Sequence, residues 1–382
     1  MSPPPIDRLV TLTRDLIVIP STESRPEERA RCFTLLRNHL EALGGITIRD
    51  FSSEGFASMT VMPQGIDTPD ILLVAHLDVI EHPHPDAYTS RVTEGRIYGP
   101  GSGDMKGQAA IMLELFCDLQ RRHPGLSFGL AYTSDEERGG ENGVRYLFED
   151  IGLRCGLAIV PDGGSIHDVT VAEKGILHIN LSTAGRESHA ARPWLAPNAL
   201  TALMRGLLRV CDHFEALKES GLNDHWYPTC VPTILNTPNQ TINCIPGEAT
   251  AHLDLRYPPP HTRESLLATI RELAGPEITV ARIMGAESTQ LAPDPLYLQV
   301  TEELTGEAVR LVRASGGSDA RFIAQFDIPV VLSRPLVGNL HGLDEWIDIE
   351  SMGLYYQICE EFILRKLGKK HLIHQRTPLQ HL

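Results

Sequence analysis

The sequence predicts a two-domain protein in which a layered α/β domain is interrupted by a ferredoxin-like α+β domain. Continuous apolar runs at 71–75, 126–132 and 156–160 are typical of strands that are buried on both faces of a sheet. Helical patterns at 106–122 and 141–150 lie between these runs, which is the alternation of an α/β layer. Further along the chain, apolar residues alternate with polar ones, as expected for strands with one face in water.

Two amphipathic helices are expected before the first apolar run. Apolar residues recur at helical spacing between residues 6 and 17 and again between residues 30 and 43. We expect Ser24 to cap the second helix, Pro26 to lie in its first turn, and the Gly-Gly pair that follows to end it.

The alternating pattern marks an inserted domain at 175–286. In "GILHINLST" and "EATAHLDLR" every second residue is apolar. Two helical patterns, at 197–217 and 262–274, and two more strands, at 230–236 and 277–284, complete the order β-α-β-β-α-β of a ferredoxin-like unit. Residues 1–174 and 287–382 are therefore predicted to form the other domain.

The composition argues against several functional classes. The chain has 34 basic and 49 acidic residues, so its net charge is −15, and we expect no nucleic-acid partner. It has no apolar run of about 20 residues and no signal-peptide pattern at its start, which predicts no membrane association and a cytoplasmic location. The seven cysteines are scattered without a Cys-x-x-Cys pair, which favours reduced and mostly buried thiols.

Each apolar run is followed by residues that bind metals or transfer protons. "HLD" follows the first run, "SDEE" the second and "PD" the third, and open α/β sheets place their sites at the carboxyl ends of strands. Asp104 in a glycine-rich turn and His341 far downstream are two further candidates. The full set is His76, Asp78, Asp104, Glu136, Glu137, Asp162 and His341. Nitrogen and carboxylate oxygen without thiolate suit zinc, manganese or cobalt. Because the candidates outnumber the ligands of one catalytic zinc, two ions bridged by a carboxylate are the simpler interpretation.

Each motif taken alone has an alternative interpretation. The acidic triplet "DEE" is also compatible with a solvated turn, and His341 with a structural histidine. The glycines of "GPGSGDMKG" lack the Lys-Ser/Thr ending of a phosphate loop, which favours a tight turn around Asp104. In "ILLVAHLDVIEHPHP", His76 ends a strand, whereas His82 and His84 lie beside prolines and are predicted to be loop residues that line the pocket.

Five motifs in order carry a resemblance to a known family. "HLDV", "GPGSGDMKG", "TSDEERGG", "PDGG" and "NLHGLDEW" resemble those of the family that contains acetylornithine deacetylase, succinyl-diaminopimelate desuccinylase, aminoacylase and glutamate carboxypeptidase. The resemblance extends over most of the chain. It implies a zinc-exopeptidase-like catalytic domain, with helices on both faces of a mixed sheet, and an inserted lid domain through which the chain forms a homodimer.

The resemblance also implies two divalent metal ions, with zinc expected and cobalt or manganese as alternatives. It makes His76 a ligand of one ion, Asp104 the bridging carboxylate, Glu137 and His341 ligands of one site or the other, and Asp162 the remaining ligand.

Two carboxylates receive supporting roles from the same resemblance. Asp78 accepts the other imidazole N–H of His76 and so fixes its tautomer. Glu136 is the general base, which takes a proton from the attacking water and returns it to the leaving amine.

Substrate contacts are implied in both domains. His189 in "GRESHAARP" resembles the family histidine that stabilises the tetrahedral oxyanion, and Asn243 resembles a neighbouring substrate contact. Arg256 lies on the polar face of its strand, where a guanidinium is able to hold a substrate carboxylate. In "SGGSDARF", Ser318 belongs to a loop near the substrate and Arg321 is a further candidate anion contact.

The expected reaction is hydrolysis of an amide bond in a small carboxylate-bearing substrate, an N-acyl amino acid or a short peptide. Chain length and "GGSDARF" resemble the deacetylase and desuccinylase branch, whereas an aspartate at Asp162 is more typical of the exopeptidases. The loop "EHPHPDAYTSRVTEGRIYG" also departs from the usual pattern. The alternative from another class is a non-catalytic binding protein, but such a protein is expected to lack Glu136 or a ligand, and none is missing.

Overall fold

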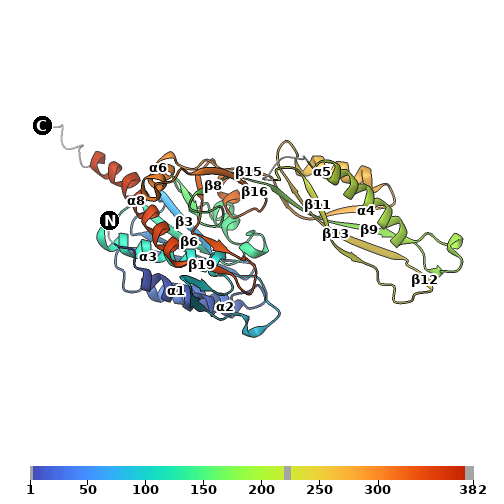
Figure 1. The fold of residues 1–382 in the computed structure, drawn as a ribbon, viewed down its shortest axis with the longest axis horizontal. Coiled ribbons are helices and arrows are strands. Elements are labelled where there is room, and N and C mark those ends of the chain that lie inside the picture. Colours follow the sequence, from blue (N-terminus) through green and yellow to red (C-terminus); the bar gives the residue numbers. More distant parts are fainter. Residues whose placement is uncertain (1–2, 219–224, 375–382) are drawn as a thin grey trace. The chain divides into compact units, whose positions relative to one another are not determined.

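The computed structural model describes residues 3–218 and 225–374 of the chain, which divides into two compact units (Figure 1). The first unit consists of Met1–Val171, Leu291–Val312 and Ser318–Leu382. The second consists of Ala172–Gln290 and Arg313–Gly317. The main divisions lie within a few residues of the predicted ones, but the assignment of Arg313–Gly317 to the second unit was not predicted. Strand pairing explains this assignment, because β16 pairs with β8 and the Lys174 amide donates to the Ala314 carbonyl.

A mixed sheet forms the centre of the first unit. Its strands follow the order β1-β2-β6-β3-β7-β17-β8-β15, with β16 also paired to β8. The strands are β1 (Ile46–Ser53), β2 (Phe56–Pro63), β3 (Ile71–His76), β6 (Phe128–Thr133), β7 (Ala158–Val160), β8 (Asp168–Glu173), β15 (Thr289–Gln290), β16 (Arg310–Ala314) and β17 (Val330–Leu332). The four central strands β6, β3, β7 and β17 are parallel, and the outer pairs that include β1 with β2 and β17 with β8 are antiparallel. The predicted α/β fold class is confirmed.

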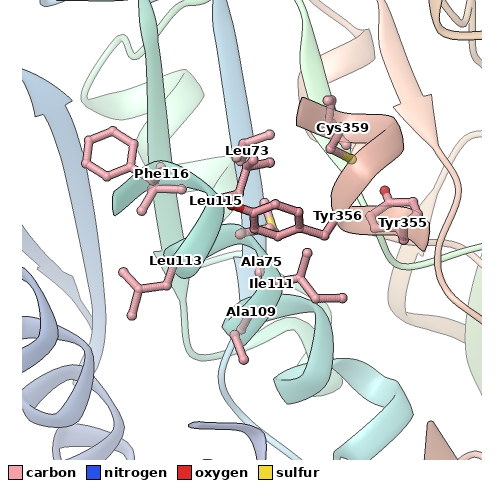
Figure 2. Close-up of a cluster of buried hydrophobic side chains, with 14 of the residues drawn as sticks. Leu73, Ala75, Ala109, Ile111, Leu113, Leu115, Phe116, Tyr355, Tyr356 and Cys359 are labelled. Atoms are coloured by element: carbon pink, nitrogen blue, oxygen red, sulfur yellow. The ribbon is translucent and has the colours of Figure 1, made fainter. Parts of the chain in front are cut away.

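Both faces of this sheet are buried, which explains the continuous apolar runs. Along β3, Leu73 and Ala75 enter one hydrophobic cluster, whereas Leu72 and Val74 enter a second cluster on the opposite face. Figure 2 shows Leu73 and Ala75 meeting side chains of α3 and α8, among them Tyr356. A strand with no solvent-facing side has no position for a polar residue until it ends.

Helices cover both faces. Those that contribute to the first cluster are α1 (Ile6–Ile17), α2 (Pro26–Leu40), α3 (Gly107–Arg122), α6 (Pro295–Thr305) and α8 (Ile349–His374). The second cluster contains residues of α7 (Ala320–Ala324) and of the single turn η4 (Tyr146–Asp150). No helix within the described ranges has both the length and the apolar character that crossing a membrane requires.

One local expectation was wrong and another holds only in part. The residue that precedes α2 is Arg25 rather than Ser24, whose hydroxyl donates to Glu81 instead. The helix expected at 141–150 begins later, because residues 144–150 are helical and 141–143 form a turn. The preceding segment instead wraps around a buried carboxylate, because Asp135 accepts a hydrogen bond from the Asn142 amide at 2.6 Å.

A small antiparallel sheet of the first unit lies beside the start of α3. Its order is β18-β19-β5-β4. The strands are β4 (Arg91–Thr93), β5 (Arg96–Tyr98), β18 (Val337–Gly338) and β19 (Trp346–Asp348), and the short turn η1 (Pro85–Ala87) precedes them. Gly103 packs so closely against it that an added Cβ would lie 2.8 Å from Cβ of Val337.

The second unit has the predicted element order β-α-β-β-α-β. Its four-stranded antiparallel sheet has the order β11-β13-β9-β14, and α4 and α5 pack on one face of it (Figure 1). The elements are β9 (Gly175–Ala184), α4 (Ala199–Ala216), β11 (Thr229–Asn236), β13 (Glu248–Tyr257), α5 (Arg263–Ala274) and β14 (Thr279–Ala286). A small ribbon of β10 (Ser188–His189) and β12 (Cys244–Ile245), with the turn η5 (Pro193–Leu195), extends this unit.

The turn around Asp135 yields a stability prediction. A Cβ on Gly143 would lie 2.2 Å from the Asp135 carboxylate and 2.8 Å from Cβ of Thr133, both of which are buried. We expect Gly143→Ala to lower the free energy of unfolding by about 1–3 kcal/mol through overpacking, measured by chemical denaturation. Gly44→Ala is the control, because its Cβ would meet no atom within 4 Å. Equal stability of the two variants would contradict this account.

Candidate functional site

The chemically reactive strand ends of the first unit lie at one edge of its sheet. His76 is the last residue of β3, Glu136 and Glu137 lie in the turn η3 (Glu136–Arg138) after β6, and Asp162 follows β7 by two residues. These strands are parallel neighbours, so their carboxyl ends meet at the same edge.

Two further residues reach this edge from turns. Asp104 lies in η2 (Ser102–Lys106), directly before α3. His341 lies between β18 and β19 and has a left-handed backbone with φ of 63°. Asn339 in the same turn also has a positive φ, and its side-chain amide donates to Asp344 at 2.7 Å. A non-glycine residue adopts this conformation at a free-energy cost that tertiary contacts must offset.

The site residues form two groups that share Asp104. Potential ligand atoms of His76, Glu136 and Asp162 lie within 4.8 Å of one another, and so do those of Asp104, Glu137 and His341. One carboxylate oxygen of Asp104 lies 3.1 Å from Nε2 of His76, and the other lies 3.3 Å from Nε2 of His341. Asp104 therefore occupies a bridging position, because each of its oxygens faces the histidine of a different group.

Asp78 supports both groups from behind. Its Oδ1 lies 3.5 Å from Nδ1 of His76, which also lies 3.1 Å from the Asp78 carbonyl oxygen. Its Oδ2 accepts a hydrogen bond from the backbone amide of Glu137 at 3.0 Å. The sequence predicted that the Asp78 carboxylate accepts the His76 N–H, whereas the hydrogen-bond partner of Nδ1 is the Asp78 carbonyl. The contact with the Glu137 backbone was not predicted.

Burial raises the pKa of several carboxyl groups here. Burial, followed by the charge of Asp162, raises the pKa of Glu136 well above its usual value. Burial, followed by the charge of Asp104, does the same to the pKa of Asp162. The pKa of Glu137 is also raised by burial, although a hydrogen bond with His341 opposes the shift. Ionised carboxylates that repel one another in a poorly solvated space are stabilised by protons or cations bound between them.

The same carboxylates favour the protonated form of the two histidines. Burial disfavours the charged form of His76, but hydrogen bonds with Asp104 and Asp78 outweigh it and raise its pKa well above the usual value. Hydrogen bonds with Asp104 and Glu137 raise the pKa of His341 to about 10. Burial opposes ionisation of Asp104, yet its hydrogen bonds with the two histidines leave its pKa lowered.

The donor set fits divalent metal ions. It contains imidazole nitrogen and carboxylate oxygen, the ligands that zinc, manganese and cobalt accept. Histidine nitrogens and carboxylate oxygens that lie 3.1–3.3 Å apart are also spaced as two ligands of one ion. A metal ion would displace protons from these groups, because neutral imidazole and ionised carboxylate are the binding forms.

Sequence reasoning missed the residue that holds the Asp104 turn. Glu345 is buried, with 2% exposure, and its carboxylate accepts hydrogen bonds from the backbone amides of Gly103, Asp104 and Gly101 at 2.7, 2.9 and 3.2 Å. It lies inside the motif "NLHGLDEW", so the motif itself was the available signal. Glu345 fixes the backbone from which the bridging carboxylate projects.

Arg334 was also missed. It follows β17 by two residues, and its Nη1 lies 3.7 Å from Oδ1 of Asp162. It directly follows the apolar run "IPVVLS", so the available signal was again a polar residue at the end of a buried strand.

The predicted contacts of the "SGGSDARF" loop lie close to the acidic turn. Ser318 is buried, and the guanidinium of Arg321 donates to the carbonyls of Ser318 at 3.0 Å and Gly139 at 2.7 Å. Asp319 between them is also buried, and burial raises its pKa to about 7. Arg321 therefore ties this loop to the turn that carries Glu136.

The other three predicted contacts lie in the second unit. His189 is exposed on β10, and Asn243 lies beside it because its carbonyl accepts the Ala190 amide at 2.8 Å. Arg256 is half-buried and donates twice to Asp254, at 2.8 and 3.1 Å. Asp254 in turn lies 3.1 Å from Nε2 of His178.

The loop after β3 separates its two histidines. His82 is buried and packs edge-on against Tyr88 at 5.7 Å between ring centroids, whereas His84 is exposed. A cavity of about 440 Å³ opens beside Asp78 and Glu137, and neither histidine lines it.

Comparison with known proteins agrees with this geometry. A family model described as peptidase family M20/M25/M40 matches residues 72–365. A curated relative, the succinyl-diaminopimelate desuccinylase of Rhodospirillum centenum, is 29% identical, and the match covers 95% of this chain and 98% of that protein.

Solved structures show the same fold. An M20 family metallo-carboxypeptidase from Sulfolobus solfataricus superposes with a TM-score of 0.76 at 18% identity, covering 94% of this chain and 99% of that one. A dinuclear metal-binding peptidase of the M20 family from Bacillus subtilis superposes with a TM-score of 0.65 at 14% identity, covering 95% and 98%. The chain belongs to the peptidase family M20/M25/M40 and is a metal-dependent hydrolase of amide or peptide bonds.

Proposed function

We propose that the protein is a dinuclear-metal hydrolase that removes the acyl group from a small N-acyl amino acid. The observation that carries this proposal is the bridging position of Asp104, with one oxygen facing His76 and the other facing His341. Two groups that share a carboxylate are arranged for two ions rather than one.

The proposed ligands follow the two groups. His76 and Asp162 hold one ion, Glu137 and His341 hold the other, and Asp104 bridges them. We propose zinc as the metal, with cobalt or manganese as alternatives, because all three accept nitrogen and oxygen ligands.

Glu136 is the proposed general base. Two bound divalent ions would polarise the scissile carbonyl and acidify a water molecule. Glu136 accepts the proton of that water and delivers it to the leaving amine. Burial and the charge of Asp162 raise its pKa, which suits a group that must hold a proton between these two steps. Asp78 keeps the His76 ring and the Glu137 backbone in place.

The choice of substrate class rests on the relatives. The relative from R. centenum is named a desuccinylase, which supports an acyl group as the leaving part. Exopeptidase activity on dipeptides is the second candidate, because the Sulfolobus neighbour is a carboxypeptidase and Asp162 replaces the glutamate expected of deacylases.

We propose that the first unit is the catalytic domain and that the second unit is a lid that supplies substrate contacts. His189 would stabilise the oxyanion, Asn243 and Arg256 would contact the substrate, and Ser318 and Arg321 would shape the pocket. The fixed geometry of Arg256 on Asp254 supports a role in holding a carboxylate, because a guanidinium orientated in advance loses less entropy on binding.

We also propose a homodimer that forms through the second unit. The edge strand β11 exposes Val231, Ile234 and Leu235, and the neighbouring helix α4 exposes Met204 and Leu208. Large apolar side chains gathered on adjoining elements favour a protein partner.

All seven cysteines are free thiols, which supports the proposed cytoplasmic location.

A substrate panel with and without metal tests the proposed activity. We expect the protein to hydrolyse N-acetyl or N-succinyl amino acids, to lose activity after dialysis against EDTA, and to regain it with zinc, cobalt or manganese. Amine release measures turnover, and elemental analysis measures about two metal ions per chain. Turnover of dipeptides alone would favour the exopeptidase candidate, and metal-independent turnover would contradict the mechanism.

Substitution of the proposed base is the second test. We expect Glu136→Gln to lower kcat by about 10²–10⁴-fold, because the amide has no basic carboxylate, while metal content stays at the wild-type value. Glu141→Gln is the matched control, since Glu141 is 59% exposed and pairs with Arg145. Retained activity in Glu136→Gln would refute the assignment.

The dimer is tested by its mass in solution. Leu208 is 59% exposed on α4, and Leu208→Glu would place a charge in the proposed interface. We expect light scattering to give a dimer for the wild type and a monomer for this variant. A wild-type monomer would contradict the proposal. Val92→Glu, at a residue that is 45% exposed in the first unit, serves as the control.

A further inference from the structure

A fourth strand end contributes a residue to the site. Strand β17 is parallel to β7, and Leu332 is in register with Val160. Arg334 and Asp162 each follow these paired residues by two positions, so they emerge side by side at the same edge. Nη1 of Arg334 lies 3.7 Å from Oδ1 of Asp162.

The guanidinium of Arg334 has an unusual environment. Its side chain is only 14% exposed, yet none of the hydrogen bonds found within residues 3–218 and 225–374 involves its nitrogen atoms, and Nε is buried without a partner. Arg321 of the same unit, by contrast, donates to two carbonyls. Guanidinium carries five N–H donors and stays charged, so an ion pair at 3.7 Å leaves the Nε donor buried without a partner and the other donors without a hydrogen-bond acceptor among the described residues.

The backbone beside Arg334 is firmly held. The Ser333 carbonyl accepts a hydrogen bond from the buried Tyr355 hydroxyl at 2.7 Å, and the Ser333 hydroxyl lies 3.1 Å from the hydroxyl of Tyr297. Pro335 follows directly and restricts the backbone of Arg334. The Arg334 side chain therefore starts from a fixed backbone position at the edge that also carries Asp162.

We propose that Arg334 binds a carboxylate of the substrate next to the metal centre. A carboxylate would accept two parallel hydrogen bonds from the planar guanidinium and neutralise its charge. The inference rests on the proposed function and deepens it, because it makes a negatively charged group close to the scissile bond a requirement for good substrates. Arg334, a residue of the first unit, is thereby added to the substrate contacts that the sequence predicted.

The carboxylate has two possible sources, which substrates can separate. One is the α-carboxylate of the amino-acid part, and the other is the terminal carboxylate of a dicarboxylic acyl group such as succinyl. N-acetyl amino acids carry only the first, N-succinyl amino-acid amides carry only the second, and N-acetyl amino-acid amides carry neither.

The experiment compares wild type, Arg334→Gln and Arg334→Lys on these three substrates at saturating zinc. The measured quantity is the ratio of kcat/KM for a carboxylate-bearing substrate to kcat/KM for the neutral substrate. We expect Arg334→Gln to lower this ratio on the order of 100-fold for one of the two carboxylate-bearing substrates, because the substrate carboxylate loses its buried charged partner. Arg334→Lys keeps the charge without the fork and should lie between the two. Arg49→Gln is the control, since Arg49 is 57% exposed on the edge strand β1.

Two further measurements keep the outcomes distinct. Elemental analysis reports whether Arg334→Gln still binds metal, and calorimetry of the zinc-loaded proteins with succinate and with an N-acetyl amino acid reports carboxylate binding without turnover. Weaker binding in Arg334→Gln at full metal content supports the proposal even if the wild type hydrolyses none of the three substrates, a result that would contradict only the proposed function. Equal losses on charged and neutral substrates, unchanged carboxylate binding, or a loss explained by metal content would overturn it.

Discussion

The carboxylate of Asp104 is the contact on which the site depends. It joins His76 at the end of a buried strand to His341 in a distant turn, at 3.1 and 3.3 Å. The backbone of its turn is held by Glu345 through three amides, and Gly103 leaves no room for a side chain against Val337. The small sheet that carries His341 and Glu345 must therefore pack against this turn before the two groups can share a carboxylate.

This arrangement concentrates negative charge where water is scarce. Burial, together with the charges of neighbouring carboxylates, raises the pKa values of Glu136 and Asp162, and burial raises the pKa of Asp135 to about 6. Burial of unpaired carboxylates opposes folding, and the first unit offsets it with two large hydrophobic clusters on the two faces of its sheet. Carboxylates gathered at such a cost to folding mark a functional site, and their charge favours cations.

The two units contribute different chemistry. The first unit carries all the proposed metal ligands and the proposed base, at strand ends and in the turns beside them. The second presents Arg256 from an open sheet face, where the pairing of Asp254 with both Arg256 and His178 sets its direction locally. If the proposed roles hold, the reaction class is associated with the first unit, whereas substrate choice would depend on groups in both units, Arg334 among them. A relative named a desuccinylase and a structural neighbour named a carboxypeptidase are consistent with that division.

The sequence by itself determined the fold class, the inserted β-α-β-β-α-β unit and the residues that gather at Asp104. Buried strands are apolar until they end, and the reactive residues that follow them mark the edge of the sheet. These signals are local and periodic, so they can be read from neighbouring residues. Only the tertiary structure decided the position of Glu345 on the Asp104 turn, the isolation of Arg334, the bond from Ser24 to Glu81 and the transfer of Arg313–Gly317 to the second unit. Each of these depends on contacts between segments far apart in the chain, whose distances no local pattern contains.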